Sequence, residues 1–242
     1  MNPILLIPAR LASTRLPAKP LADIGGVPMI VRVLRQAEAA GLGPVAVAAG
    51  EPEIAAVVEA AGGRAVLTDP GLASGSDRIH AALEKLDPER RHDVVINLQG
   101  DLPALDPAQI RTVAAALTHS GADIATLAAE IVDPSERGNP SVVKAVVAWD
   151  PDGRQGRALY FTRATAPGGE GPLFHHVGIY AYRRDALARF VALPPSPLET
   201  REKLEQLRAL EANMSIAVAR VDSVPLSVDT PSDLERARKI LS

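Results

Sequence analysis

Three cationic side chains fall within ten residues near the start of the sequence, in the segment PARLASTRLPAKPL. Arg10, Arg15 and Lys19 are separated mainly by small residues, and prolines restrict the backbone between them. Cations at this spacing can bind several phosphates at once, and the hydroxyls of Ser13 and Thr14 add hydrogen-bond donors. A solvated basic loop has a similar composition, but the length of the segment and its place after an apolar run favour phosphate binding. It has neither the Rossmann nor the P-loop glycine pattern.

Two carboxylates, far apart in the sequence, can complement these cations. Asp101 follows the apolar run DVVINL in NLQGDLP, and Asp229 lies in SVDTPSDLE. A carboxylate at the end of a strand, facing a phosphate-binding loop, has the position expected of a Mg²⁺ ligand. Taken alone, the Asp101 motif is more typical of a turn or a helix N-cap, and Asp229 is also compatible with the start signal of the last helix. Thr230 suits the capping role, which favours Asp229 slightly as a metal ligand.

The segment LASGSDRIH is a third place for ligand contacts. It offers Ser74, Gly75, Ser76 and Arg78 directly after a predicted strand. Small donors before a helix N-terminus suit a base, a ribose or a phosphate. Capping of the helix by Ser76 explains the same residues equally well.

Further polar side chains lie on or beside later strands. These are Arg163, His176 and Tyr180, and one of the adjacent pair His175 and His176 is expected to be merely solvated. The sequence has no HExxH or other metal-binding histidine spacing. It also has no G-x-S-x-G motif, which argues against hydrolysis through a serine nucleophile.

The first half of the chain alternates between strand and helix signals, and this alternation must position the loops above. Strands are predicted at 4–7, 45–49, 64–68 and 93–98, and helices at 28–40, 52–61, 76–86 and 107–118. A βαβα rhythm predicts a parallel sheet with helices on both faces and right-handed crossovers. Ligands of such sheets bind in the crevice beyond the carboxyl ends of the strands, where the three loops would lie.

The second half is less regular. Strands are predicted at 142–150, 158–164, 177–183 and 215–221, an amphipathic stretch at 198–212 and a closing helix from 231. The break near 133–139 is the expected boundary of a second lobe.

Composition excludes several classes of protein. The 242 residues include no Cys, so disulfides, thiolate zinc sites and a cysteine nucleophile are ruled out. A formal net charge of −3 argues against a protein that coats nucleic acid or an acidic membrane. No apolar run approaches the roughly 18 residues of a membrane span, and no secretory leader is recognisable. We expect a soluble, cytoplasmic protein with a core of Ala, Val, Leu and Ile.

The motifs occur in one order along one chain, and together they resemble those of a known family. The set PARLASTRLPAKPL, SGSDR, NLQGD, NPSVVK, ALYFTRA, HHVGIYAYRR, PSPLE, LEQLRALE and VDTPSDLERAR is similar to 3-deoxy-D-manno-octulosonate (Kdo) cytidylyltransferases, also called CMP-Kdo synthetases. The resemblance runs from Ile4 to about Leu241. It implies transfer of CMP from CTP to the anomeric hydroxyl of Kdo, with release of pyrophosphate, for lipopolysaccharide biosynthesis.

The resemblance also implies a fold and an assembly. The fold is that of the nucleotide-diphospho-sugar transferases, an α/β architecture with a mostly parallel twisted sheet, helices on both faces and a small dimerisation lobe. Residues 1–132 would bind CTP, 133–220 would form the sugar-binding and dimerisation lobe, and 221–242 would carry a metal ligand and the closing helix. A homodimer is implied, with neither a nucleic-acid partner nor membrane insertion.

Site residues are implied in three groups. Arg15, Lys19 and Asp101 resemble the catalytic residues, and Asp101 and Asp229 match the positions that hold Mg²⁺. The nucleotide contacts would be Ala9, Arg10, Ser13, Arg15, Lys19, Ser74, Gly75, Arg78 and Gln99. The sugar-acid site would be formed by Arg163, His176, Tyr180, Glu205 and Gln206. Without the resemblance, Glu205 and Gln206 would be taken for an exposed helix face.

The sequence departs from the family pattern near the expected sugar site. Leu102 stands where Glu is common, Ser76 replaces Thr and Ser227 replaces Gly, and the segment 166–174 is short. These departures leave related sugar acids open as substrates, such as 8-amino-Kdo or sialic acid. A catalytically inert nucleotide-sugar-binding module is a further alternative. Such a module would be expected to have lost Lys19, Asp101 or Asp229.

Overall fold

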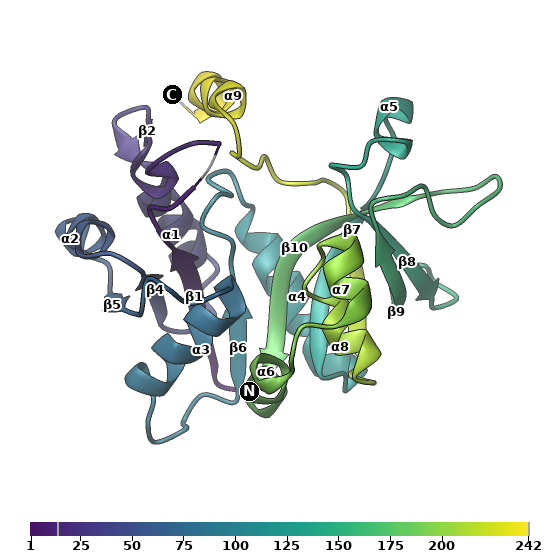
Figure 1. Cartoon of the computed structure of the whole chain (residues 1–242), viewed down its shortest axis with the longest axis horizontal. Helices are drawn as coiled ribbons and strands as arrows, with labels where there is room; N and C mark the ends of the chain where they lie inside the picture. Colours follow the sequence, from purple (N-terminus) through teal and green to yellow (C-terminus); the bar gives the residue numbers. More distant parts are fainter. Residues whose placement is uncertain (14, 242) are drawn as a thin grey trace. The chain divides into compact units, whose positions relative to one another are not determined.

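The computed structural model describes residues 1–13 and 15–241 (Figure 1). The chain divides into two compact units: Met1–Arg111 together with Pro225–Ser242, and Thr112–Val224. The first unit is therefore discontinuous in sequence. The functional division into 1–132, 133–220 and 221–242 is a different partition and stays a prediction. Within the described residues, no helix is long and apolar enough to cross a lipid bilayer.

The first unit is built on parallel strands in the order β5-β4-β1-β6. The strands are β1 (Pro3–Ala9), β4 (Val45–Ala49), β5 (Ala65–Leu67) and β6 (Val94–Asn97), with a small hairpin of β2 (Asp23–Ile24) and β3 (Val27–Pro28). The helices are η1 (Lys19–Leu21), α1 (Met29–Ala39), α2 (Pro52–Ala60), α3 (Gly75–Leu86), α4 (Pro107–Ser120), in which the first unit gives way to the second, and α9 (Pro231–Leu241). Every strand and helix predicted in this half is confirmed.

The order of the strands creates the place for a ligand. The chain runs outward from β1 to β4 and β5, and then returns to β6 on the other side of β1. Right-handed crossovers place α1 and α2 on one face and α3 on the other, so β1 is covered on both faces. Leu5, Leu6 and Ile7 are accordingly fully buried. The strand order reverses between β1 and β6, which is where α/β sheets bind their ligands.

The end of the chain packs against its beginning. Val228, Leu234 and Ala237 share one apolar cluster with Ile24 and Met29. Figure 1 shows α9 beside β2, and the Arg238 side chain donates to the Asp23 carbonyl at 2.9 Å. Burial of this cluster therefore fixes the segment that precedes α9.

The second unit contains a mixed sheet with the strand order β10-β7-β11-β9-β8. Its elements are β7 (Ile124–Glu130), α5 (Pro134–Arg137), β8 (Lys144–Trp149), β9 (Gln155–Thr162), β10 (Phe174–Arg183), α6 (Arg184–Ala192), α7 (Pro197–Glu202), α8 (Leu207–Glu211) and β11 (Ile216–Val221). Strand β7 pairs parallel with β11 and antiparallel with β10. Neither β7 nor α6 was predicted from the sequence.

The amphipathic stretch 198–212 is not one continuous helix. Lys203 closes α7 in the left-handed conformation, with φ of 57°, and α8 begins at Leu207. The turn buries Leu204 and Gln206, which are 6% and 7% exposed. The break therefore directs the residues of the LEQ segment inward rather than onto an exposed helix face.

Gly100 is expected to control how closely the loop after β6 approaches β1. A Cβ atom at this position would lie 2.9 Å from the Pro8 carbonyl oxygen, which is too close for a carbon atom. We expect Gly100→Ala to lower the free energy of unfolding by about 1–3 kcal/mol, measured by urea denaturation. Gly138→Ala is the control, because a Cβ atom there would have no atom of the described residues within 4 Å. Equal stability of the two variants would contradict the close approach.

Candidate active site

A cavity of about 390 Å³ opens beyond the carboxyl ends of β1 and β6, entirely within the first unit. Its volume is in the range of small-molecule sites. The loops that follow β1, β5 and β6, and the segment before α9, all contribute to its wall. The lining includes every residue assigned above to the nucleotide or the metal: Ala9, Arg10, Ser13, Arg15, Lys19, Ser74, Gly75, Arg78, Gln99, Asp101 and Asp229.

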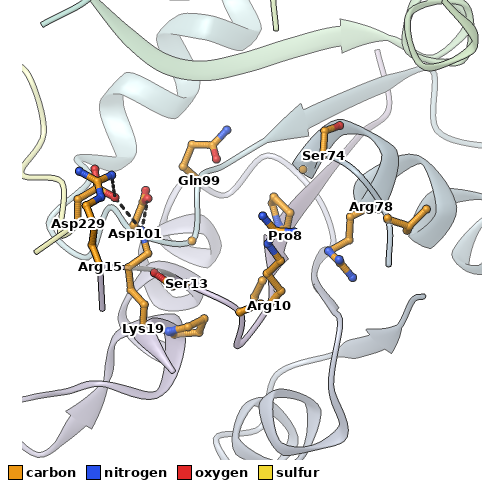
Figure 2. Close-up of a pocket in the computed structure, with 16 residues that line it drawn as sticks. Pro8, Arg10, Ser13, Arg15, Lys19, Ser74, Arg78, Gln99, Asp101 and Asp229 are labelled. Atoms are coloured by element: carbon orange, nitrogen blue, oxygen red, sulfur yellow. Dashed lines mark hydrogen bonds and ion pairs between the residues drawn. The ribbon is translucent and has the colours of Figure 1, made fainter. Parts of the chain in front are cut away.

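An ammonium group between two carboxylates forms the centre of charge in this cavity. Lys19 Nζ lies 2.7 Å from Asp101 Oδ2 and 3.0 Å from Asp229 Oδ1. Figure 2 shows these three side chains at one end of the pocket, with Arg15 beside them. Burial alone would lower the pKa of Lys19, but the charges and hydrogen bonds of the two carboxylates outweigh burial and raise it above its ordinary value. Lys19 is therefore a fixed cation at any physiological pH.

The remainder of the loop after β1 is anchored at its start. The Leu11 N–H donates to Glu51 Oε2 at 2.8 Å, and the Ala18 N–H donates to the Leu11 carbonyl at 3.2 Å. Arg15 reaches Asp229 at 3.4 Å with a side chain that is 66% exposed, so it is free to turn toward a ligand. Thr14 lies outside the described residues. Glu51 was missed at the level of sequence, because the loop after the predicted strand 45–49 was not among the three loops considered.

Neither Asp101 nor Asp229 caps a helix. Thr230 does so for α9, because its Oγ1 accepts the Asp233 N–H at 3.2 Å and donates to the Asp233 carboxylate. The Asp101 side chain bonds to Lys19, while its carbonyl accepts the Val228 N–H at 3.0 Å. Both carboxylates thus face the cavity, as the metal-ligand interpretation requires.

At the other end of the pocket, Ser74 and Arg78 have structural bonds. Ser74, not Ser76 as considered above, caps α3 through a reciprocal pair of bonds with Asp77. Arg78 is 2% exposed, and its guanidinium donates to Thr68 Oγ1 at 2.7 Å and to the Asp69 carbonyl at 3.1 Å. Arg78 therefore holds the loop after β5 in place at the wall of the cavity. Its contact with a nucleotide stays a prediction.

Arg163, the candidate partner of a substrate carboxylate, is held by Glu202 in the second unit. Arg163 Nε donates to the Glu202 carbonyl at 3.0 Å, and Nη1 donates to the Pro140 carbonyl at 3.0 Å. The Glu202 carboxylate accepts the Arg163 N–H and the hydroxyls of Thr162 and Tyr160. Burial would raise the pKa of Glu202, but these donors lower it overall. Glu202 was not among the residues predicted from the sequence, although it lies close to Glu205.

Two further residues of the predicted sugar site are neighbours in the second unit. The His176 and Tyr180 rings are 5.5 Å apart, and His176 is 9% exposed. Burial, helped by His175, lowers the pKa of His176 to about 3. Burial and the nearby Tyr182 and Glu205 raise the pKa of Tyr180. At neutral pH this pair is therefore uncharged.

Glu205 and Gln206 lie in the turn between α7 and α8. Gln206 is buried, and within the described part of the chain its Nε2 has no hydrogen-bond partner. A buried amide donor is costly unless something accepts its hydrogen bond. This placement fits a ligand contact and contradicts the exposed helix face considered as the alternative.

The donor set at Asp101 and Asp229 fits a hard divalent cation. Across residues 1–13 and 15–241, no group of three or more His, Cys, Asp or Glu side chains is arranged to hold a metal ion. A cation such as Mg²⁺ prefers one or two protein carboxylates completed by phosphate oxygens and water. The ammonium of Lys19 shows that a positive charge is already stable between these two carboxylates.

Comparison with known proteins identifies the family. A family model described as cytidylyltransferase matches residues 4–216. A 3-deoxy-manno-octulosonate cytidylyltransferase of Parvibaculum lavamentivorans is 67% identical over 100% of this chain and 93% of its own length. Its counterpart from Rhodospirillum centenum is 66% identical over 99% of this chain and 93% of its own length. The chain belongs to the 3-deoxy-manno-octulosonate cytidylyltransferase family.

A solved structure agrees with this membership. It is described as CMP:2-keto-3-deoxy-manno-octonic acid synthetase complexed with CTP, and it is 38% identical to this chain. The match covers 100% of this chain and 98% of the other, with a TM-score of 0.90. The nucleotide-diphospho-sugar transferase-like α/β fold expected from the sequence is thereby confirmed. As a 3-deoxy-manno-octulosonate cytidylyltransferase family member, the chain is a nucleotidyltransferase.

The buried imidazole of His176 is expected to make stability depend on pH. Because its pKa falls from 6.5 to about 3 on folding, the unfolded chain binds more protons between these values. The free energy of unfolding should therefore decrease as pH falls below 6.5, by at most about 1.4 kcal/mol per pH unit from this group. Urea denaturation of wild type and His176→Gln between pH 7 and about 4.5 measures the difference in slope. Parallel curves would contradict burial of a neutral imidazole.

Proposed function

We propose that the chain transfers CMP from CTP to the anomeric hydroxyl of Kdo, giving CMP-Kdo and pyrophosphate for lipopolysaccharide biosynthesis. The observation that carries this proposal is the cavity in which Arg10, Arg15 and Lys19 face Asp101 and Asp229. The choice of CTP as the nucleotide rests on the similar solved structure, which is a complex with CTP. The choice of Kdo as the sugar acid rests on the names of the relatives. The alternatives of an inert binding module or a sialic-acid enzyme have no such support.

The reaction requires no covalent enzyme intermediate. The anomeric oxygen of Kdo attacks the α-phosphorus of CTP, the bond from the α-phosphorus to the bridging oxygen breaks, and pyrophosphate leaves. Positioning and charge stabilisation provide most of the catalysis in such transfers. Arg10, Arg15 and Lys19 would bind the triphosphate and stabilise the negative charge that grows on pyrophosphate as it leaves.

The proposal includes Mg²⁺ bound by Asp101 and Asp229. A divalent cation there would neutralise phosphate charge and lower the pKa of the attacking hydroxyl. Lys19 occupies the space between these carboxylates in the free protein. On binding of the triphosphate with its cation, Lys19 would leave the carboxylates and contact the phosphates instead. The same ammonium would thus serve as counterion in the free protein and as phosphate ligand in the complex.

The sugar acid would be bound by residues of the second unit. The Arg163 guanidinium, fixed by Glu202 and Pro140, is a suitable partner for the carboxylate of Kdo. The uncharged pair His176 and Tyr180, together with the side chains in the turn between α7 and α8, would bind its hydroxyls. This division gives one cationic partner for the substrate carboxylate and several polar side chains for its hydroxyls, which suits a polyhydroxylated acid.

Two further properties follow from family membership and are part of the proposal. We expect the protein to act as a homodimer, as the resemblance implies. We expect it to work in the cytoplasm, where CTP is available, with neither nucleic acid nor membrane as a partner.

The transfer reaction is tested by pyrophosphate release with CTP, Mg²⁺ and Kdo. We expect turnover with Kdo and much less with sialic acid, while 8-amino-Kdo tests the influence of Leu102. Asp101→Ala should lower kcat/KM by a factor of roughly 10²–10³, since it removes a cation ligand at the reacting phosphates. Folded wild-type protein that releases no pyrophosphate with Kdo would refute the proposal.

A neighbouring carboxylate provides the matched control for Asp101. Asp106 is exposed, follows Asp101 closely in the sequence and accepts the Ala108 N–H at 2.8 Å, away from the cavity lining. Asp106→Asn keeps an acceptor there, so wild-type turnover is expected. An equal loss of kcat/KM in Asp101→Ala and Asp106→Asn would show that the effect is not specific to the carboxylate in the cavity.

The proposed replacement of the Lys19 ammonium by a metal ion between the two carboxylates gives a separate prediction. Lys19→Met removes the ammonium from between Asp101 and Asp229, which leaves two like charges without their counterion. We expect the free variant to bind Mn²⁺ at least about tenfold more tightly than wild type, a difference of about 1.4 kcal/mol. Electron paramagnetic resonance of free Mn²⁺ measures this affinity without nucleotide. An unchanged or weaker affinity of the variant for Mn²⁺ would contradict the idea that the Lys19 ammonium and a metal ion compete for the same two carboxylates.

A further inference from the structure

A hydroxyl group lies buried beside the imidazole of His176. Thr126 belongs to the otherwise apolar strand β7, IATLAAE, which ends at Glu130, and it is 0% exposed. A polar side chain in such a place is costly unless its hydrogen bonds are satisfied. Thr126 is therefore expected to have a specific role in the second unit.

Thr126 Oγ1 has three polar neighbours. It lies 2.8 Å from the Ile179 carbonyl, 3.1 Å from the Val177 carbonyl and 3.0 Å from His176 Nε2. A hydroxyl has a single proton to donate, and carbonyl oxygens can only accept. The proton must point toward the carbonyls, because without it two oxygen lone pairs would face the Thr126 oxygen at hydrogen-bond distance. The Thr126 oxygen then accepts from His176, which requires a proton on Nε2.

The backbone of β10 is irregular where these carbonyls lie. Its pairing with β7 shifts register between Val177 and Tyr180, so the backbone around Gly178 bulges out of the regular ladder. Thr126 pairs with Tyr180 at this irregularity, and its hydroxyl lies within hydrogen-bond distance of the Val177 and Ile179 carbonyls. The position of its proton is thus imposed by the fold and not by the imidazole.

We propose that Thr126 fixes His176 as the Nε2–H tautomer, so that His176 Nδ1 is an unprotonated acceptor for a hydroxyl of the sugar-acid substrate. Thr126 is a positioning residue in this proposal, because it acts through His176. The substrate part of the inference rests on the proposed function, whereas the tautomer does not.

The surroundings of His176 agree with an acceptor role. The hydrogen bond of the ring to Thr126 is made by Nε2, and the ring is oriented by Phe161 and Tyr180 at centroid distances of 4.8 and 5.5 Å. With a pKa of about 3, His176 stays neutral at physiological pH and is a poor general base. It therefore recognises a hydroxyl by accepting its hydrogen bond, and does not remove the proton that is lost in the transfer.

The tautomer is measured first, on the free wild-type protein. Long-range ¹H–¹⁵N correlation spectra of histidine rings at neutral pH distinguish protonated from unprotonated ring nitrogens, and His176→Gln assigns the signal. We expect a protonated Nε2 and an unprotonated Nδ1. The opposite tautomer in wild type would overturn the proposal whether or not the protein uses Kdo.

Variants at Thr126 then connect the tautomer to substrate binding. Thr126→Val keeps the shape and removes the hydroxyl, so we expect a mixture of tautomers and a KM for Kdo raised about five- to tenfold. The KM for CTP should not change. Thr126→Ser keeps the hydroxyl and should restore both the wild-type tautomer and the KM for Kdo. If Thr126→Val does not fold, Thr126→Cys serves in its place, because sulfur is a weak acceptor.

The outcomes separate this inference from the proposed function. Wild-type protein that does not turn over Kdo refutes the proposed function, and the spectra still decide the role of Thr126. Turnover by wild type, combined with an unchanged tautomer and KM in Thr126→Val, overturns the inference alone. Failure of Thr126→Ser to restore the tautomer would also overturn it, since that variant would then show a purely structural effect.

Discussion

The ammonium of Lys19 between Asp101 and Asp229 is the contact on which the first unit depends. It joins residues that are 82 and 210 positions apart in the sequence. A partly buried cation requires compensating charge, and the two carboxylates would repel each other without it. The crossovers of the sheet and the packing of Val228 against the start of α1 both serve to bring these three side chains together.

The lining of the cavity in the first unit could be predicted from the sequence because its residues lie at or directly after the ends of strands. Ala9 ends one apolar run, and Gln99 and Asp101 follow another, so the parallel topology alone places their loops at one edge. For Asp229 the local sequence offered only slight support, because Thr230 suits the helix cap, and its assignment as a metal ligand came from the family resemblance. Ser76 could not be assigned correctly, since the turn before α3 allows either serine to cap and local spacing does not decide between them.

The surroundings of Arg163, His176 and Tyr180 in the second unit could not be derived in this way. Strand β7 is rich in Ala, which has a low strand propensity, so it was missed together with Thr126, although a lone polar residue in an apolar run was a usable signal. The break at Lys203 depends on burial of Leu204 and Gln206, which is a tertiary effect that helical spacing does not reveal. Glu202 acts through its contacts with Arg163, and these form only after folding.

The first unit starts with Met1–Arg111 and is completed only by the segment from Pro225 onward. Ribosomes add residues in order, so the whole second unit is synthesised before Asp229. A nascent chain that has not reached this residue has the basic loop and Asp101, but it lacks the second carboxylate and the apolar cluster around Leu234. Assembly of the pocket must therefore wait until the second unit has been synthesised, and a chain that terminates before Asp229 cannot complete it.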